Sequence, residues 1–133
     1  MSAVLHSIGI KGFFNCKKLE NAELPNAIQS IGGEAFSGCT VLKTIKLSNT
    51  LWNLGERAFF RCENVTKLTF PGSITKIPDL AFCGCYGLAE LIIEEGVVEI
   101  GSSAFSSCSA LSSVALPDTL STIGSWGFSG CGF

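Results

Sequence analysis

The sequence predicts a solenoid of the α/β class, in which each coil holds short strands and one helical turn. A first observation is a fixed period, because six cysteines recur every 23 residues. A second is that a phenylalanine precedes each of these cysteines by three residues. A third is the length, since 133 residues hold five full periods with little left over. We therefore expect a single domain, 1–133, of about five full repeats with partial repeats at both ends.

Each period follows the pattern I-G-x-x-A-F-x-x-C-x-x-L-x-x-I-x-L-P-x-x-L-x-x. In its second half, apolar residues two apart, such as Ile45 and Leu47, alternate with polar ones, which is typical of a strand with one buried face. A proline follows in three copies and ends the strand, because it cannot donate to a ladder. A second short extended piece then lies within 27–31, 51–54, 74–77, 97–100 and 120–123.

The remaining part of each period turns the chain back to its start. Glycine at positions 32, 55, 101 and 124 predicts a corner with an unusual backbone angle. Pro78 replaces it in the fourth copy, so we expect that corner to differ. The A-F-x-x-C-x-x-L segment that follows has apolar residues every three positions, which suits one helical or 3₁₀ turn. Such a turn is too short to be stable alone.

Stacking of the coils places equivalent residues in rows about 4.8 Å apart. One row holds the six phenylalanines, and another holds Cys16, Cys39, Cys62, Cys85, Cys108 and Cys131. Stacked side chains point the same way rather than at each other, so we expect a ladder of free, buried thiols. Cys83 lies outside this row. A lone C-x-C is a weak zinc signal, and we interpret Cys83 as a partly exposed free thiol, with an intermolecular disulfide as the alternative.

Catalytic chemistry has little support in the sequence. His6 is the only histidine, so no Cys/His pair or Ser/His/Asp set forms without it. Asp79 and Asp118 are the only aspartates, and both follow a proline in expected turns. Glu94 and Glu95 are adjacent on an expected strand and point to opposite faces. We expect no enzyme, no cofactor and no metal site.

Composition and charge restrict the partners. A net charge of −2 without a basic run argues against nucleic acid. No stretch approaches the roughly 18–20 apolar residues of a membrane helix, so we expect no membrane insertion. The start, residues 1–6, lacks the basic and apolar regions of a signal peptide. Residues 1–67 carry a net charge of +3 and residues 68–133 one of −5. This division favours head-to-tail contacts between copies, with a chance imbalance as the alternative.

Solenoids usually bind partners on extended faces, and here the first strand of each coil offers outward-facing positions. We expect the partner-binding residues to be Thr44, Lys46, Lys67, Thr69, Glu90, Ile92, Glu94, Ser113 and Ala115. A merely solvated sheet is the alternative, because this face has few aromatic residues.

Four aromatic residues stand at variable positions of the repeat. Trp52 is a candidate exposed anchor, with edge packing as the alternative. Trp126 precedes Gly127, a smaller residue than the usual alanine, and we expect it to pack locally. Phe14 and Phe60 lie beside the phenylalanine row and add an apolar patch if they are exposed.

The repeat resembles the BspA-like class of leucine-rich repeats, whose 23-residue unit reads roughly LxxIxIPxxVxxIGxxAFxxCxxL. Five consecutive matches cover essentially the whole chain. The resemblance implies a right-handed horseshoe or arc, with a parallel sheet on its concave side. It also implies a protein on the cell surface or secreted, which adheres to host or matrix proteins. The export signal, caps and anchor that are usual in the family are not evident, so we expect an uncapped array.

The expected function is a non-enzymatic domain for protein–protein interaction or adhesion, which binds a protein partner through the solenoid surface. The alternative is a structural spacer or self-associating module that assembles through its ends.

Overall fold

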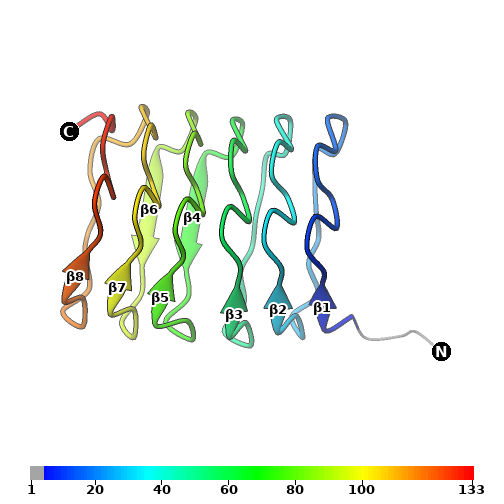
Figure 1. Cartoon of the computed structure of the whole chain (residues 1–133), viewed down its shortest axis with the longest axis horizontal. Coiled ribbons are helices and arrows are strands. Elements are labelled where there is room, and N and C mark those ends of the chain that lie inside the picture. The colour runs from blue at the N-terminus through cyan, green and yellow to red at the C-terminus, as the bar shows by residue number, and fades with distance from the viewer. Residues whose placement is uncertain (1–4) are drawn as a thin grey trace.

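The computed structural model describes residues 5–133, which wind into successive coils that stand side by side along one axis (Figure 1). Residues 1–4, part of the start where no signal peptide is expected, lie outside the described residues. Strand partners confirm the length of the coil, since Ser7 pairs with Ser30 and Ser30 with Asn53. Each coil therefore holds one 23-residue repeat, as the spacing of the cysteines predicts.

All strand pairs are parallel and join neighbouring coils. A first strand row contains the four-residue strands β4 (Lys67–Phe70) and β6 (Glu90–Ile93), which lie behind in Figure 1. A second row, along the lower edge of that view, contains β1 (Ser7–Ile8), β2 (Ser30–Ile31), β3 (Asn53–Leu54), β5 (Lys76–Ile77), β7 (Glu99–Ile100) and β8 (Thr122–Ile123).

Proline weakens the first strand row outside the pair of β4 and β6, the one full ladder of this row among residues 5–133. The N–H of Glu94 donates to the carbonyl of Phe70 at 3.0 Å and closes the end of this pair. Proline holds the position of Glu94 in three other copies and has no N–H to donate. Elsewhere in the row the predicted strands are reduced to single bridges, such as Asn21 with Thr44 and Ile92 with Ala115.

Pro78 divides the second strand row in the same way. Strands β1, β2 and β3 form one sheet and β5, β7 and β8 another, whereas β3 and β5 are not paired. In other copies a corner glycine donates its N–H to the preceding coil, as Gly101 does to Ile77 at 2.8 Å. Proline lacks this hydrogen, so the predicted difference at this corner is confirmed.

The prediction of an unusual backbone angle at the corner glycines is wrong. Positive φ angles occur instead at Gly38, Gly84, Gly96 and Gly130. The corner glycines serve close approach between coils. A Cβ atom on Gly55 would lie 2.2 Å from the backbone nitrogen of Gly33.

Replacing Gly55 by alanine should lower the free energy of unfolding by about 1–3 kcal/mol or more, because overpacking usually costs this much. The clash is with backbone, so the two coils must separate locally. Gly9→Ala is the matched control, because a Cβ atom at this corner of the first coil would meet no other atom within 4 Å. Urea unfolding of both variants checks the expectation, and an equal loss in the two would contradict it.

The predicted helical or 3₁₀ turn is also wrong, since no helix is present among residues 5–133 and the fold is a parallel β-solenoid. The segment is a run of consecutive turns: the Ser37 N–H donates to the Glu34 carbonyl at 3.1 Å, but the Phe36 N–H reaches Ala58 in the next coil at 2.7 Å. Left-handed φ angles of 57° at Glu34 and 75° at Gly38 prevent helical propagation. Hydrogen bonds between coils therefore replace those of a helix.

The expected phenylalanine row forms the centre of the core. Ring centroids are 5.2 Å apart between Phe36 and Phe59, and 5.3 Å apart between Phe82 and Phe105, with nearly parallel planes. These four rings are almost completely buried, whereas Phe13 at the first coil is 39% exposed. Each coil therefore needs its neighbours to bury this ring.

The cysteine ladder is confirmed, because its six members are free and the four central ones are buried, whereas Cys16 and Cys131 at the ends are partly exposed. The thiol of Cys62 donates to the carbonyl of Phe36 in the preceding coil at 3.2 Å, and Cys85 contacts Phe59 in the same way at 3.3 Å. Burial raises the pKa of the Cys108 thiol to about 12 and that of Cys85 well above its ordinary value. Burial therefore keeps Cys62, Cys85 and Cys108 neutral, and each of them joins its coil to the preceding one.

Cys83 is a partly exposed free thiol, as predicted. Its partial burial raises the pKa of the thiol, against the lowering influence of the Arg61 guanidinium. Formation of an intermolecular disulfide stays a prediction.

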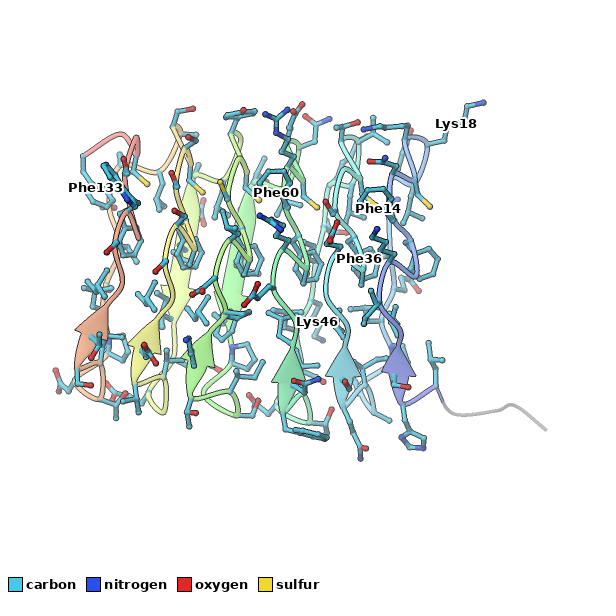
Figure 2. All side chains as sticks on the ribbon, viewed as in Figure 1. Phe14, Lys18, Phe36, Lys46, Phe60 and Phe133 are labelled. Carbon is cyan, nitrogen blue, oxygen red and sulfur yellow. The ribbon has the colours of Figure 1, made fainter. Side chains whose placement is uncertain are left out.

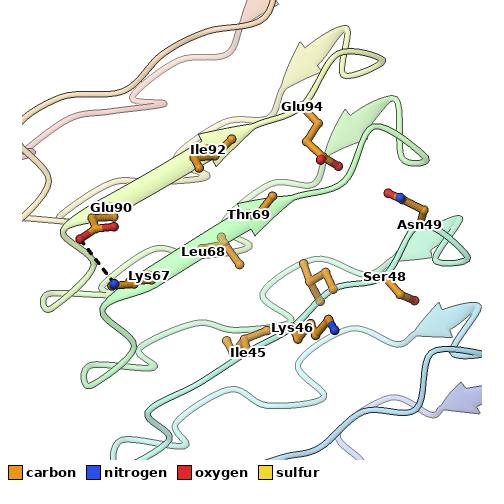
Figure 3. A pocket seen from close by; sticks show the side chains of 11 residues that line it. Ile45, Lys46, Ser48, Asn49, Lys67, Leu68, Thr69, Glu90, Ile92 and Glu94 are labelled. Atoms are coloured by element: carbon orange, nitrogen blue, oxygen red, sulfur yellow. Dashed lines mark ion pairs between the residues drawn. The ribbon is translucent and has the colours of Figure 1, made fainter.

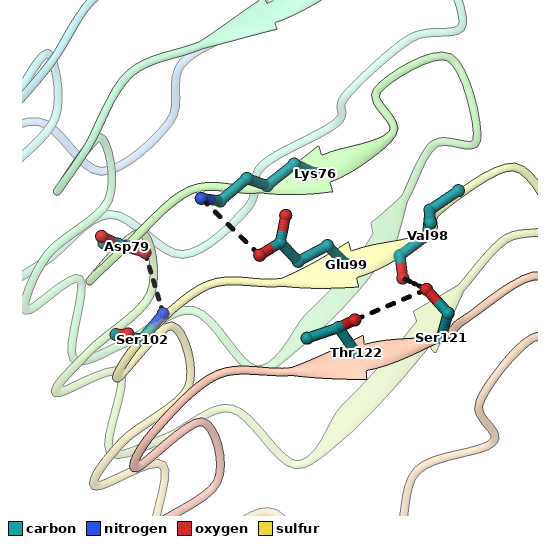
Figure 4. Close-up of polar contacts among 7 residues, drawn as sticks. All are labelled: Lys76, Asp79, Val98, Glu99, Ser102, Ser121 and Thr122. Atoms are coloured by element: carbon teal, nitrogen blue, oxygen red, sulfur yellow. Dashed lines mark hydrogen bonds and ion pairs between the residues drawn. The ribbon is translucent and has the colours of Figure 1, made fainter.

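Polar contacts near the second strand row also join adjacent coils (Figure 4). Lys76 Nζ lies 3.9 Å from Glu99 Oε1, and the backbone N–H of Ser102 donates to Asp79 Oδ1 at 2.8 Å. Asp79 thus binds the next coil. The sequence predicts only a role in its own turn for this residue.

Candidate functional site

The outward-facing residues of the first strand row form what we call the strand face. Six of the nine predicted partner-binding residues line one hollow of about 560 Å³ on this face (Figure 3). They are Lys46, Lys67, Thr69, Glu90, Ile92 and Glu94. Ile45, Leu47 and Leu68 supply apolar lining, and Ser48 and Asn49 complete it.

The hollow lies where the first strand row is interrupted. Strand β4 pairs with β6 on one side, but not with the residues around Ile45 on the other. Pro71 follows β4 and cannot donate a hydrogen bond to the preceding coil. The backbone therefore leaves an unpaired step in the sheet, and side chains from three coils surround it.

The charged groups of the hollow are only partly paired. Lys67 Nζ lies 3.8 Å from Glu90 Oε1, and both side chains are largely exposed, so this pair contributes about 0–1 kcal/mol to stability. Within the described part of the chain, Lys46 and Glu94 form no ion pair. Ile92, 58% exposed, belongs to the same hollow. The site therefore combines an exposed apolar side chain with one available cation and one available carboxylate.

The other three predicted residues lie outside this hollow. Thr44 is exposed, and its hydroxyl donates to Asn21 Oδ1 at 3.4 Å. Ser113 and Ala115 are also exposed, farther along the same row. Asn49 was missed, although the absence of a proline after Leu47 in this copy is a signal that could have found it.

Trp52 is 67% exposed, which argues against edge packing, and its role as an anchor stays a prediction. It lines a separate hollow of about 360 Å³, together with Glu56, Pro78 and Asp79, where β3 and β5 are unpaired. The expected packing of Trp126 is wrong, because this side chain is 71% exposed.

Within residues 5–133, no group of three or more His, Cys, Asp or Glu side chains is arranged to hold a metal ion. The same residues contain no helix with the length and apolar character needed to cross a bilayer.

Comparison with known families decides the classification. The BspA type Leucine rich repeat region matches residues 6–133 in six copies. The chain belongs to this family. BspA-type repeats form leucine-rich repeat domains, which typically bind proteins and are generally non-catalytic. The comparison with curated proteins found no match.

Solved structures of leucine-rich repeat proteins share the fold. A leucine rich cell surface protein from Faecalibacterium prausnitzii has a TM-score of 0.87 and 28% identity over 95% of this chain and 34% of its own. A leucine-rich repeat protein of T. pallidum has a TM-score of 0.80 and 31% identity, over 90% of this chain and 63% of its own. A leucine-rich repeat protein from Bacteroides ovatus has a TM-score of 0.75 and 28% identity, over 99% of this chain and 40% of its own. This BspA-type chain therefore spans about a third to under two thirds of these proteins.

Proposed function

We propose that this BspA-type domain is a non-enzymatic module that binds a protein partner through the strand face. The observation that carries the proposal is the convergence of six strand-face residues on one hollow of about 560 Å³. Ile92 offers an apolar contact, 58% exposed, that a partner would bury. Lys46 and Glu94 offer opposite charges beside it, which select a partner by complementary charge.

A stable interface buries about 800 Å² on each partner, which is more than the hollow itself offers. The partner therefore also covers neighbouring positions of the same rows, including Thr44, Ser113 and Ala115. An extended surface of this kind suits a folded protein or a long peptide segment rather than a small molecule.

An adhesive role outside the cell is the finer form of the proposal. It is supported by the Faecalibacterium relative, which is a cell surface protein. A host or matrix protein is then the proposed ligand.

The test is binding of the purified domain to a panel of purified extracellular-matrix and serum proteins by biolayer interferometry. For a protein that binds, Lys46→Glu and Ile92→Ser should each weaken affinity about tenfold or more, the range of interface hot spots. Lys18→Glu and Val98→Ser are matched controls, because both side chains are exposed outside the hollow. The assignment would be contradicted if the control variants weakened the affinity as much as the site variants do. It would also be contradicted if neither site variant changed the affinity.

Self-association through the ends of the array is the second candidate. The division of charge, +3 in residues 1–67 against −5 in residues 68–133, is the observation that favours it. Sedimentation at low and high salt tests it, and a monomer at every concentration would end it.

A further inference from the structure

The outward-facing side chains of the turn segments form a second surface, which we call the turn face. Its composition changes along the array. The position next to the buried phenylalanine is held, in order, by Phe14, Ser37, Phe60, Cys83, Ser106 and Ser129. The fold accepts serine there in three copies, so core packing does not require the two aromatic residues.

These two rings border a hollow of about 580 Å³ on the turn face. Figure 2 shows Phe14 and Phe60 on the coils that flank the one bearing Phe36. The intervening coil presents Ser37, which is 5% exposed, and Gly38. Two coil spacings separate the rings by roughly 10 Å. That separation accommodates one branched aliphatic or aromatic side chain between them.

Cations surround the two rings. Lys11 Nζ lies 5.1 Å from the centroid of the Phe14 ring, and the Arg61 guanidinium lies 5.7 Å from that of Phe60. Lys17 and Arg57 line the same hollow. Two carboxylates, Glu34 and Glu63, also line it, and the cations remain in excess.

The arginines of the turn face are available for a partner. All three ion pairs within residues 5–133 join a lysine to a glutamate 23 positions away: Lys43 with Glu20, Lys67 with Glu90, and Lys76 with Glu99. Neither Arg57 nor Arg61 takes part in one. Guanidinium groups bind carboxylates through two parallel hydrogen bonds, which makes them well suited to an acidic partner.

The backbone indicates that Arg61 is not there for stability. It adopts a left-handed φ of 57°, and the same position is glycine in three other copies, at Gly38, Gly84 and Gly130. Glycine adopts this conformation without the steric cost that arginine carries. Asn15 and Ser107 adopt the same conformation in the two remaining copies, so the backbone does not require an arginine at this position.

We propose that the turn face of the first three coils binds an acidic segment of a partner protein. One apolar side chain of that segment enters between Phe14 and Phe60, and carboxylates on either side of it pair with Arg57 and Arg61. A nucleic acid fits less well, because it needs a larger basic surface than these few cations provide. This hollow shares no lining residue with the hollow of the strand face, so separate substitutions can test the two surfaces.

The test uses the purified domain and a fluorescein-labelled peptide of sequence Glu-Glu-Phe-Glu-Glu, followed by fluorescence anisotropy. We expect saturable binding that weakens as salt is raised. Phe60→Ser and Arg61→Gly should each weaken it at least tenfold, and replacing the peptide's phenylalanine by alanine should do the same.

Both substitutions copy residues that the chain itself has at equivalent positions, so folding should be retained. The melting temperature of Arg61→Gly should equal or exceed that of the wild type, which separates binding from stability. Lys46→Ala, which removes a cation from the strand face, is the matched control and should leave peptide binding unchanged.

Several results would overturn the proposal. These are an absence of saturable peptide binding, an equal effect of Lys46→Ala and Arg61→Gly, and tighter binding of an oligothymidylate than of the peptide. If the domain does not bind the peptide but forms a dimer, and Arg61→Gly abolishes that dimer, the turn face binds a second copy of the chain instead. None of these outcomes bears on strand-face binding, which Lys46→Glu and Ile92→Ser test separately.

Discussion

Replacing Phe82 by alanine is expected to lower the free energy of unfolding by about 3–5 kcal/mol. The ring is 1% exposed and lies between Phe59 and Phe105, with centroids 5.3 Å away on both sides. It also meets Phe70 edge to face at 6.2 Å. Removing it leaves a cavity in the middle of the row. Neither neighbouring ring can fill this cavity without losing its contact with the next ring on its other side. Guanidinium unfolding followed by circular dichroism measures the loss.

Phe13→Ala is the matched control for this prediction. The Phe13 ring is 39% exposed and stacks on one neighbour only, Phe36, at 5.2 Å. We expect its removal to cost about 1–2 kcal/mol, because only part of the burial energy of a phenylalanine is lost. Equal losses at Phe13 and Phe82 would show that the row does not act as a shared core.

Alkaline pH is expected to destabilise the domain strongly through its buried thiols. Burial raises the pKa values of Cys62, Cys85 and Cys108 in the folded state, for Cys108 to about 12 from 9.0. Above about pH 9 these thiols ionise in the unfolded chain but stay neutral in the native one. The unfolded state then binds fewer protons, so stability falls as pH rises.

The stability that these thiols contribute is fully present below about pH 9 and is lost as pH rises toward their folded pKa values. Each thiol is half ionised in the unfolded chain at about pH 9, so each lowers stability by about 1 kcal/mol between pH 9 and pH 10, and the three together by about 3 kcal/mol. Urea unfolding at several pH values, with a reductant present, measures the slope.

Cys85→Ala is the control for the thiol prediction. It removes one buried titrating group and should reduce the loss of stability between pH 9 and pH 10 by about 1 kcal/mol. The variant also loses some stability at neutral pH, since the side chain is 1% exposed and well packed. A slope that does not change in this variant would show that other groups cause the alkaline unfolding.

The candidate site could be predicted in part. Alternation along the first strand identifies Lys46, Thr69 and Ile92 as outward-facing residues, because side chains of a strand alternate between faces. The hollow they share could not be predicted, since it depends on which neighbouring strands lack a ladder. The cations around Phe14 and Phe60 could not be found either, because a row of turns has no simple periodic signal for exposure.

The sequence by itself determined the 23-residue coil, the stacked phenylalanines and the unbonded cysteines. A strict period places equivalent side chains above one another, whatever the details of the backbone. Only the tertiary structure decided that consecutive turns replace a helix, that Gly55 serves close approach between coils, and that Pro78 separates β3 from β5. Each of these depends on hydrogen bonds and distances between residues of neighbouring coils, and local patterns along the chain do not contain that information.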